Sequence, residues 1–307
     1  MTAKGRRRAG LAAATILLAA GAGWAVDRGL GTCEWLDRWL ERSGCVAKAH
    51  IADFQPLPFT TMMPAGEERM RIFGMRAGPG SLLQPVQLVF DLAENREAER
   101  ADLPFSRVDI FARPSPDGEE AIVGCIIGNV CDELRPQAVI LSARDGTLLR
   151  TVDRLEDRWA FPGTVPIIFE EDHLPGTGTV LAPDRATGGL RQRDPASSDS
   201  EGGPFAVPPE PTPLPGYGPE SAAVRVAPTG GRAALIDSFG KTDGTGTRVD
   251  VWDTATRAHV ARLVTDADHY LRTNAAWTAD GRHLVAFRSG GSRAPNEGVD
   301  LYVFRLR

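Results

Sequence analysis

The clearest structural signal in the chain is carried by Val249-Asp250-Val251-Trp252-Asp253-Thr254-Ala255-Thr256. Apolar and polar side chains alternate at Val249, Asp250 and Val251, and the apolar–polar pair Trp252-Asp253 follows, a pattern typical of a strand. A turn follows, and a second short apolar run begins at Val260-Ala261-Arg262-Leu263. The stretch therefore predicts two neighbouring strands joined by a tight connection.

A related pattern follows at Ala276-Trp277-Thr278-Ala279-Asp280-Gly281-Arg282-His283-Leu284-Val285, where a glycine-containing turn separates two apolar runs. Similar turns occur at Pro64-Ala65-Gly66, Ser115-Pro116-Asp117-Gly118 and Pro228-Thr229-Gly230-Gly231. Gly66 and Gly118 are 52 residues apart, and Gly231 and Gly281 are 50 apart. Gly118 and Gly231 are 113 apart, about two such periods, so a repeat without a clear turn is predicted between them.

These residues resemble the repeats of β-propeller proteins. Residues 249–263 are similar to the third and fourth strands of a WD40-type blade, and residues 276–285 are similar to the first two strands of the next blade, as also in TolB-like propellers. The resemblance implies an all-β fold over residues 51–307 with about five four-stranded blades, six or seven being the alternative counts. The chain departs from the WD40 pattern because it lacks the Gly-His dipeptide and has Arg257 where a glycine usually follows the WD turn.

The turn spacing divides the domain into blades at residues 59–103, 104–155, 156–204, 205–267 and 268–307. The last of these lacks an outer strand, since the chain ends just after the apolar run 299–306. An unpaired edge of this kind favours aggregation, so we expect residues 48–54 to supply the missing strand and close the ring.

The N-terminus has the pattern of an export segment. Lys4-Gly5-Arg6-Arg7-Arg8 precedes residues 9–26, which carry no charge and are expected to form an apolar helix. The flanking cations place the N-terminus in the cytoplasm and the remainder outside, so residues 1–26 predict a signal anchor in a bacterial inner membrane with the domain in the periplasm or outside the cell. A cleaved signal peptide with a site at Ala20-Gly21-Ala22, giving a secreted protein, is the alternative.

The cysteines follow the apolar segment, at Cys33, Cys45, Cys125 and Cys131. Paired cysteines in an exported chain indicate disulfides, and proximity in sequence predicts the pairs Cys33–Cys45 and Cys125–Cys131. The first pair would clip residues 27–50, in which residues 34–42 have the pattern of a short amphipathic helix. Free buried thiols and a metal site are the alternatives, although neither spacing is typical of zinc ligands.

Composition excludes some partners. The net charge of −5 includes Lys4, Arg6, Arg7 and Arg8, so the rest of the chain carries −5 − 4 = −9, and no basic stripe follows residue 8. Nucleic-acid binding needs clustered cations, so it is not expected. Residues 195–220 are rich in proline and serine. They predict an extended loop that does not contribute to the core.

Few residues suggest chemistry. The only dense group of possible metal ligands is Glu170-Glu171-Asp172-His173, whose oxygen-rich composition would suit calcium, with a solvated acidic turn as the alternative. The chain has no Gly-x-Ser-x-Gly motif and its histidines are scattered, so no catalytic residue is identified and no cofactor is expected.

Two classes of function remain. The first is a membrane-tethered, non-catalytic scaffold that binds a protein or peptide partner outside the cytoplasm. The second is a propeller-type hydrolase or lyase with a site at the mouth of the central channel. Three or more converging Asp, Glu, Asn or His side chains at that mouth would favour the enzyme. Because the starts of the inner strands are mostly apolar, the sequence favours the scaffold.

Overall fold

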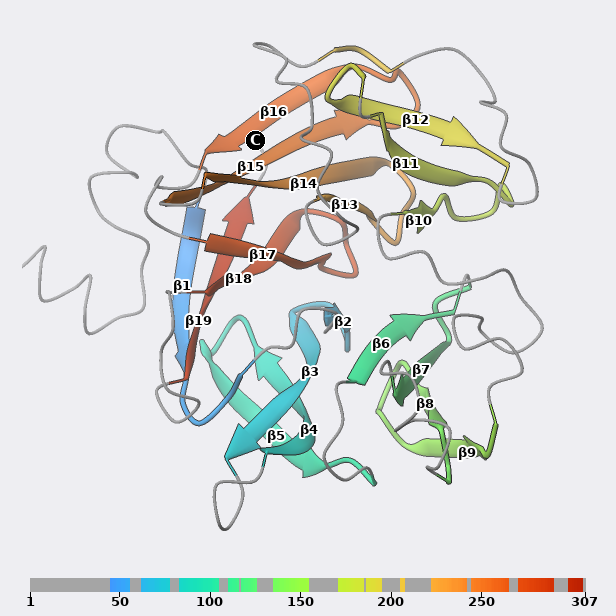
Figure 1. Ribbon diagram of the computed structural model, residues 1–307, viewed down its shortest axis with the longest axis vertical. Helices are drawn as coiled ribbons and strands as arrows, with labels where there is room; N and C mark the ends of the chain where they lie inside the picture. Colours follow the sequence, from blue (N-terminus) through green and yellow to red (C-terminus); the bar gives the residue numbers. More distant parts are fainter. Residues whose placement is uncertain are drawn as a thin grey trace, which may run out of the picture.

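The chain folds into a ring of five β-sheets, each radiating from a common centre (Figure 1). The computed structural model describes residues 45–55, 62–77, 83–104, 110–115, 117–125, 135–154, 171–184, 186–194, 205–207, 222–241, 244–264, 270–289 and 298–305. These residues form strands and turns and contain no helix. The arrangement is a five-bladed β-propeller, which confirms the predicted fold class and the preferred blade count.

Each blade is an antiparallel sheet whose strands follow one another outward from the centre. The first blade consists of β2 (Met62–Pro64), β3 (Arg69–Ala77), β4 (Leu83–Asp91) and β5 (Arg96–Asp102). The second consists of β6 (Ile110–Pro114), β7 (Glu120–Cys125), β8 (Ala138–Ser142) and β9 (Leu148–Val152). The third has three described strands, β10 (Asp172–His173), β11 (Val180–Asp184) and β12 (Gly189–Arg193), and is the repeat that the spacing placed in the middle.

The fourth blade consists of β13 (Ala222–Val226), β14 (Arg232–Lys241), β15 (Gly244–Asp253) and β16 (His259–Val264). The fifth combines β17 (Tyr270–Trp277), β18 (His283–Ser289) and β19 (Val299–Arg305) with β1 (Cys45–Ile51) from the other end of the domain. The strands β2, β6, β10, β13 and β17 are innermost (Figure 1).

Strand β1 closes the ring. It pairs antiparallel with β19, from Cys45 opposite Phe304 to Ile51 opposite Val299, which confirms the predicted closure. The strand begins at Cys45, so the propeller includes residues that the sequence assigned to the segment 27–50. Asp300 on β19 adds polar contacts across the pair, with Lys48 Nζ at 3.4 Å and His50 Nδ1 at 2.9 Å.

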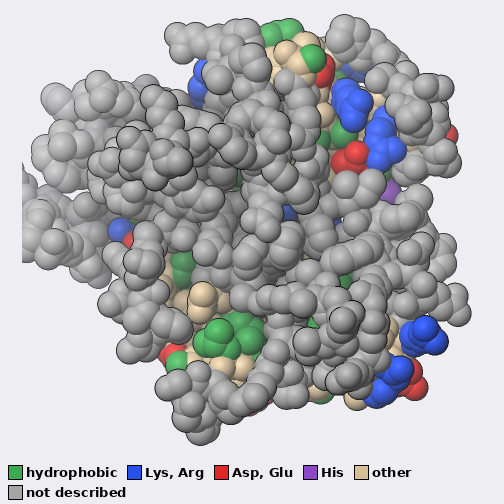
Figure 2. All heavy atoms as spheres, in the orientation of Figure 1, with side chains coloured by type: hydrophobic (Ala, Val, Ile, Leu, Met, Phe, Trp, Pro, Cys, Tyr) green, Lys and Arg blue, Asp and Glu red, His purple; other side chains and the backbone are tan. Residues whose placement is uncertain are grey.

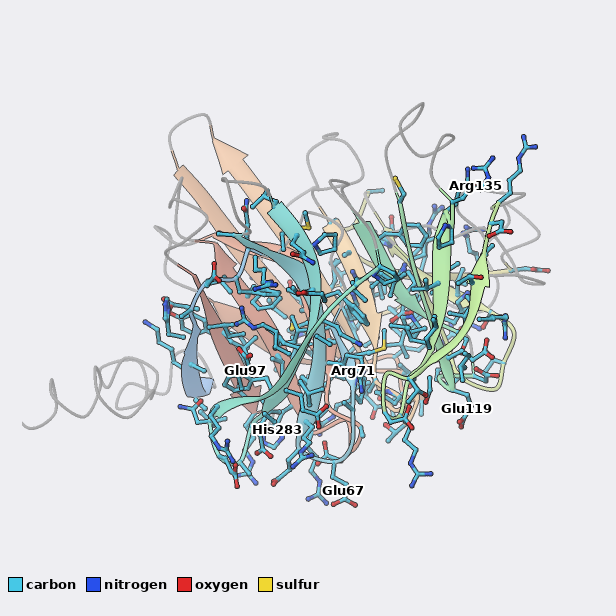
Figure 3. The ribbon with its side chains drawn as sticks, turned by 90° about the horizontal axis from the view of Figure 1, so that it is seen from below. Glu67, Arg71, Glu97, Glu119, Arg135 and His283 are labelled. Atoms are coloured by element: carbon cyan, nitrogen blue, oxygen red, sulfur yellow. The ribbon has the colours of Figure 1, made fainter. Side chains whose placement is uncertain are left out.

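The two faces of the ring differ. The turns from the inner to the second strand lie on one face, which we call the turn face. In Figure 3, Glu67, Glu119 and His283 lie at such turns along one side of the molecule, and Arg135, before β8, lies on the other side. The register of the fifth blade places Trp277, Leu284, Phe304 and Cys45 side by side, so β1 also begins at the turn face.

Apolar side chains hold neighbouring blades together. Buried clusters join the first blade to the second, the third to the fourth, the fourth to the fifth, and the fifth back to the first. Polar packing contributes between the first two blades. Arg71 of the first blade, near the middle of the view in Figure 3, donates from Nη1 to Gln87 Oε1 at 3.1 Å. Gly146 of the second blade lies so close to Arg71 that a Cβ there would be 2.0 Å from Arg71 Nη1.

Within the proline- and serine-rich stretch 195–220 the structure describes residues 205–207, and there Phe205 contributes to the core, contrary to the expectation. Phe205 is 5% exposed and packs in the cluster that joins the third and fourth blades. The carbonyl of Ala206 accepts the Nε1–H of Trp252 at 2.8 Å. The composition hid Phe205, because an average over residues 195–220 is dominated by prolines and serines.

The departure from the WD40 pattern at Arg257 is visible in the backbone. In the first, second and fourth blades the turn from the third to the fourth strand uses a left-handed residue, with φ of 53° at Asn95, 74° at Gly146 and 58° at Arg257. An arginine in this region is strained relative to glycine. The side chain of Arg257 compensates, because Nη2 donates to Gln192 Oε1 at 3.2 Å and the guanidinium lies over the Phe205 ring.

Two sets of expectations lie largely outside the described residues. The expected helices over residues 9–26 and 34–42 are among them, and within the described ranges no helix is long and apolar enough to span a membrane. Cys45 lies on β1 and Cys125 is buried at the end of β7, while Cys33 and Cys131 are not described. Both disulfide pairings therefore stay predictions.

We expect the closing strand β1 to contribute to the free energy of unfolding of the propeller. Ile51→Ala removes a buried side chain of β1 and should lower the free energy of unfolding by about 2–5 kcal/mol. Val46→Ala, at an exposed position of the same strand, should change it by less than about 0.5 kcal/mol. Chemical denaturation of both variants checks this, and equal effects would contradict a structural role for β1.

The packing of Phe205 gives a second prediction. Phe205→Ala should destabilise the protein by about 3–5 kcal/mol, because it leaves a cavity between the third and fourth blades. Val207, two residues away, is 51% exposed, so Val207→Ala should be within about 0.5 kcal/mol of the unaltered chain. If thermal and denaturant unfolding of both variants match the parent, the loop does not contribute to the core.

Candidate functional site

A cavity of about 330 Å³ lies at the turn-face end of the inner strands, and all five blades line it. Its volume is within the range of sites that hold small molecules. The walls combine apolar groups with a few polar ones. The apolar walls include Met62, Met63, Val226 and Trp277. The polar side chains are Arg113, Ser115, Asp117, Asp172, His173 and Arg225.

The register identifies equivalent positions in the five blades. The first residue of each inner turn donates its N–H to a carbonyl at or just before the start of the second strand, at 2.8–3.0 Å. These first residues are Ala65, Ser115, Leu174, Ala227 and Thr278. Two residues earlier, at one level around the axis, lie Met63, Arg113, Asp172, Arg225 and Ala276, which we call the cavity ring.

The polar members of the cavity ring each bond to the main chain of the following blade. Arg113 Nη2 donates to the carbonyl of Glu171 at 2.8 Å. Asp172 Oδ2 accepts the N–H of Val226 at 2.8 Å, and Arg225 Nε donates to the carbonyl of Ala275 at 3.1 Å. Three consecutive blade boundaries are therefore bridged by side chains at one level of the ring.

Two buried cations dominate the electrostatics of the cavity. Arg113 is 7% exposed and Arg225 is 6% exposed. Burial is the main cause that lowers the pKa of Arg225 to about 9, the charge of Arg113 lowers it further, and Asp172 opposes both. Burial also lowers the pKa of Arg113, against the influence of Asp172 and Glu171. The cavity therefore holds positive charge that Asp172 offsets in part.

His173 lies one residue closer to the turn face, at the same level as Trp277. Burial lowers its pKa, and this outweighs the attraction of Asp172 and Glu171. The imidazole is therefore neutral at pH 7 and can both donate and accept a hydrogen bond in the cavity. Trp277 is held in place because its Nε1 donates to the carbonyl of Arg225 at 2.8 Å.

The predicted acidic group is divided by the structure. Glu170 lies outside the described residues. Glu171 pairs with Arg193, whose Nε is 2.8 Å from Oε1, while Asp172 and His173 line the cavity. Among the described residues no three His, Cys, Asp or Glu side chains lie together as metal ligands. The described part of this group thus gives an ion pair and a cavity wall.

The channel mouth contains three groups that bear on the choice between enzyme and scaffold. Asp172 and His173 line the cavity from the third blade, and Asp117 from the second. Asp117 is directed into its own turn, where it accepts from the Ser115 hydroxyl and from the N–H of Glu119. Only Asp172 and His173 therefore converge among the described residues. These described groups include no nucleophile paired with a base, but they can hold a ligand.

The sequence analysis missed the two arginines. Each stands in a short, mainly apolar inner strand, IFARP or AAVRV, two residues before the first residue of its turn. That shared spacing was the available signal. Single cations in short strands are most often exposed, and only the ring places Arg113 and Arg225 in one cavity.

No protein-family profile and no curated protein sequence matches this chain. Solved structures with similar folds include hydrazine synthase of Kuenenia stuttgartiensis, which is 14% identical (TM-score 0.30). The match covers 78% of this chain and 58% of that one. A protein of unknown function from Dyadobacter fermentans is 11% identical over 86% of this chain and 99% of that one (TM-score 0.42). The WD40 domain of Toxoplasma gondii coronin is 13% identical over 78% of this chain and 55% of that one (TM-score 0.28).

The charge balance of the cavity gives a prediction. Asp172→Asn retains an acceptor for Val226 but leaves the two arginines less balanced, so it should destabilise the protein by about 1–3 kcal/mol. In an Arg225→Gln background, Asp172→Asn should lower the free energy of unfolding by a smaller amount. A double-mutant cycle should then give a coupling free energy of about 0.5–3 kcal/mol between the two residues. Asp117→Asn, which faces its own turn, should show no coupling to Arg225. Additive costs for Asp172 and Arg225 would contradict the electrostatic interpretation.

The pKa of His173 gives a prediction about pH. Because it is lower in the folded chain than the ordinary value of about 6.5, the unfolded chain binds the proton first as the pH falls. Stability is therefore lost as the pH falls below about 6.5 towards the folded pKa. His173→Gln should make this loss shallower in urea unfolding between pH 7 and 5. His283, whose pKa is also lowered by burial, should act independently, and an unchanged slope for His173→Gln would contradict the interpretation.

Proposed function

We propose that the protein is a membrane-tethered β-propeller that acts outside the cytoplasm as a non-catalytic binding scaffold. The observation that carries the proposal is a closed five-bladed ring with a cavity on its axis, lined by every blade. Propellers of this form place groups from several blades around one site, which suits recognition.

The tether is supported by the sequence before the ring. Residues 9–26 carry no charge and follow a run of cations, which is typical of a signal anchor. Residues 27–44 lead from that segment to Cys45, where β1 begins at the turn face. A fully extended linker of this length spans at most about 60 Å, so the anchor would hold the ring near the membrane by its turn face.

A protein or peptide partner is proposed for the opposite face. The inner strands end at the turn face, so a blade with four described strands ends at the other face, and its connection to the next blade starts there. One of these connections, residues 153–171 between β9 and β10, is long, whereas β12 of the third blade ends at Arg193, opposite Val180 at the turn face. Long connections on a rigid ring are common places for recognition. On the face seen in Figure 2, described Lys and Arg side chains lie beside Asp and Glu rather than in one basic patch.

The tether is tested by fractionation of cells that produce the full chain. The chain should remain in membranes after alkaline extraction, and protease added to spheroplasts should reach the propeller. Leu18→Arg should reduce membrane retention at least tenfold because it places a charge in the apolar run, whereas Leu18→Ile should not. A new N-terminus near Ala22 would support the secreted alternative, and a protected cytoplasmic propeller would contradict the proposal.

The scaffold role is tested by site-specific photocrosslinking in cells. A photoreactive residue at Arg135, on the face opposite the turns, should give a discrete crosslinked partner, and the same residue at Glu119, on the turn face, should not (Figure 3). The partner should be identified by mass spectrometry and confirmed by binding to the purified full chain. Crosslinks that are equally diffuse at both positions would contradict a defined partner surface.

A further inference from the structure

We propose that the central cavity binds a small organic carboxylate, with the carboxylate group between Arg113 and Arg225 and the apolar part of the ligand against the walls. This inference rests on the proposed binding role of the ring and names the class of ligand for its cavity. Arg113 lines the cavity from the second blade and Arg225 from the fourth, with Asp172 of the third blade between them in chain order.

The positions of both arginines are fixed by the ring. Arg113 donates to the carbonyl of Glu171, and Arg225 donates to the carbonyls of Ala275 and Val224, the latter at 2.7 Å. These acceptors are uncharged main-chain groups of rigid inner strands. A guanidinium held in this way is pre-organised, so an anion that binds it spends little free energy on ordering the side chain.

Charge indicates a monoanion. Within the cavity ring, two cations face one carboxylate, that of Asp172, so this level carries one net positive charge. Burial disfavours both charges, and the charge of Arg113 lowers the pKa of Arg225 further. A single carboxylate would relieve both effects through charge-assisted hydrogen bonds, which are strongest in a buried site.

The walls indicate an apolar body for the ligand. Met62, Met63 and Trp277 line the cavity together with three prolines, Pro114, Pro175 and Pro228. Such a surface gains free energy when it covers a hydrocarbon group, and it offers little to a sugar or an inorganic ion. Neutral His173 adds a hydrogen-bonding group at the same end. A compact aromatic or branched aliphatic acid meets these requirements.

The test is calorimetric titration of the full-length chain, kept in detergent, with benzoate and with its uncharged isostere benzamide. Benzoate should bind at pH 7 at least tenfold more tightly than benzamide, because only benzoate can pair with the arginines. Inorganic phosphate, which lacks an apolar body, should bind at least tenfold more weakly than benzoate. Equal affinity for benzoate and benzamide, or no binding of benzoate at millimolar concentration, would overturn the proposal.

Two further arms connect the affinity to the arginines. Arg225→Gln should weaken benzoate binding at least tenfold, whereas Arg96→Gln, at an exposed arginine, should leave it unchanged. Because Arg225 also joins two blades, its variant can lose its fold, so an arm on the unaltered chain is needed. On the unaltered chain the comparison of benzoate with benzamide supplies this arm, because only the ionised ligand can pair with the guanidinium groups.

The described charged or titratable groups that line the cavity with Arg225 are Arg113 on β6, Asp117 in the turn after β6, and Asp172 and His173 on β10. Benzoate binding that is unchanged by Arg225→Gln in a folded variant would overturn the assignment of the carboxylate to this pair. This outcome leaves membrane retention and crosslinking at Arg135 unaffected. Failure of the ligand class is therefore distinguishable from failure of the scaffold role.

Discussion

The antiparallel pairing of β1 with β19 is the constraint on which the ring depends. Without β1 the fifth blade would have three strands and an open edge, and the buried cluster between the fifth and first blades would lose Ala49 and Ile51. A closed ring fixes the positions of all the inner strands relative to one another. The cavity on the axis is a consequence of this closure, because no single blade could form it.

The repeats supply one geometry and the sequence varies the chemistry. The cavity ring has the same backbone position in every blade but contains a methionine, two arginines, an aspartate and an alanine. The three polar members join consecutive blades through the main chain, so they contribute to the cohesion of the ring as well as to its charge. The blades thus remain equivalent in fold while the cavity becomes asymmetric.

The architecture could be predicted because turns and strand periods are local. Glycine turns at Gly66, Gly118 and Gly281 fixed the repeat length, and the missing outer strand indicated closure by the N-terminal segment. The site could not be predicted in the same way, because Arg113 and Arg225 are far apart in the chain and meet only across the axis. Phe205 was missed for a similar reason, since its environment is formed by the third and fourth blades.

The buried arginines are costly elements for a purely structural role. A guanidinium taken out of water loses much of its hydration, and hydrogen bonds to carbonyls repay only part of that free energy. Uncharged donors such as glutamine or tryptophan can bridge blades without this cost, and Trp277 does so beside Arg225. Two buried cations in one cavity therefore fit the carboxylate site proposed for it. Because perturbed ionisable groups cluster where ligands bind, the charge of the cavity connects the stability of the ring to the recognition of an anion.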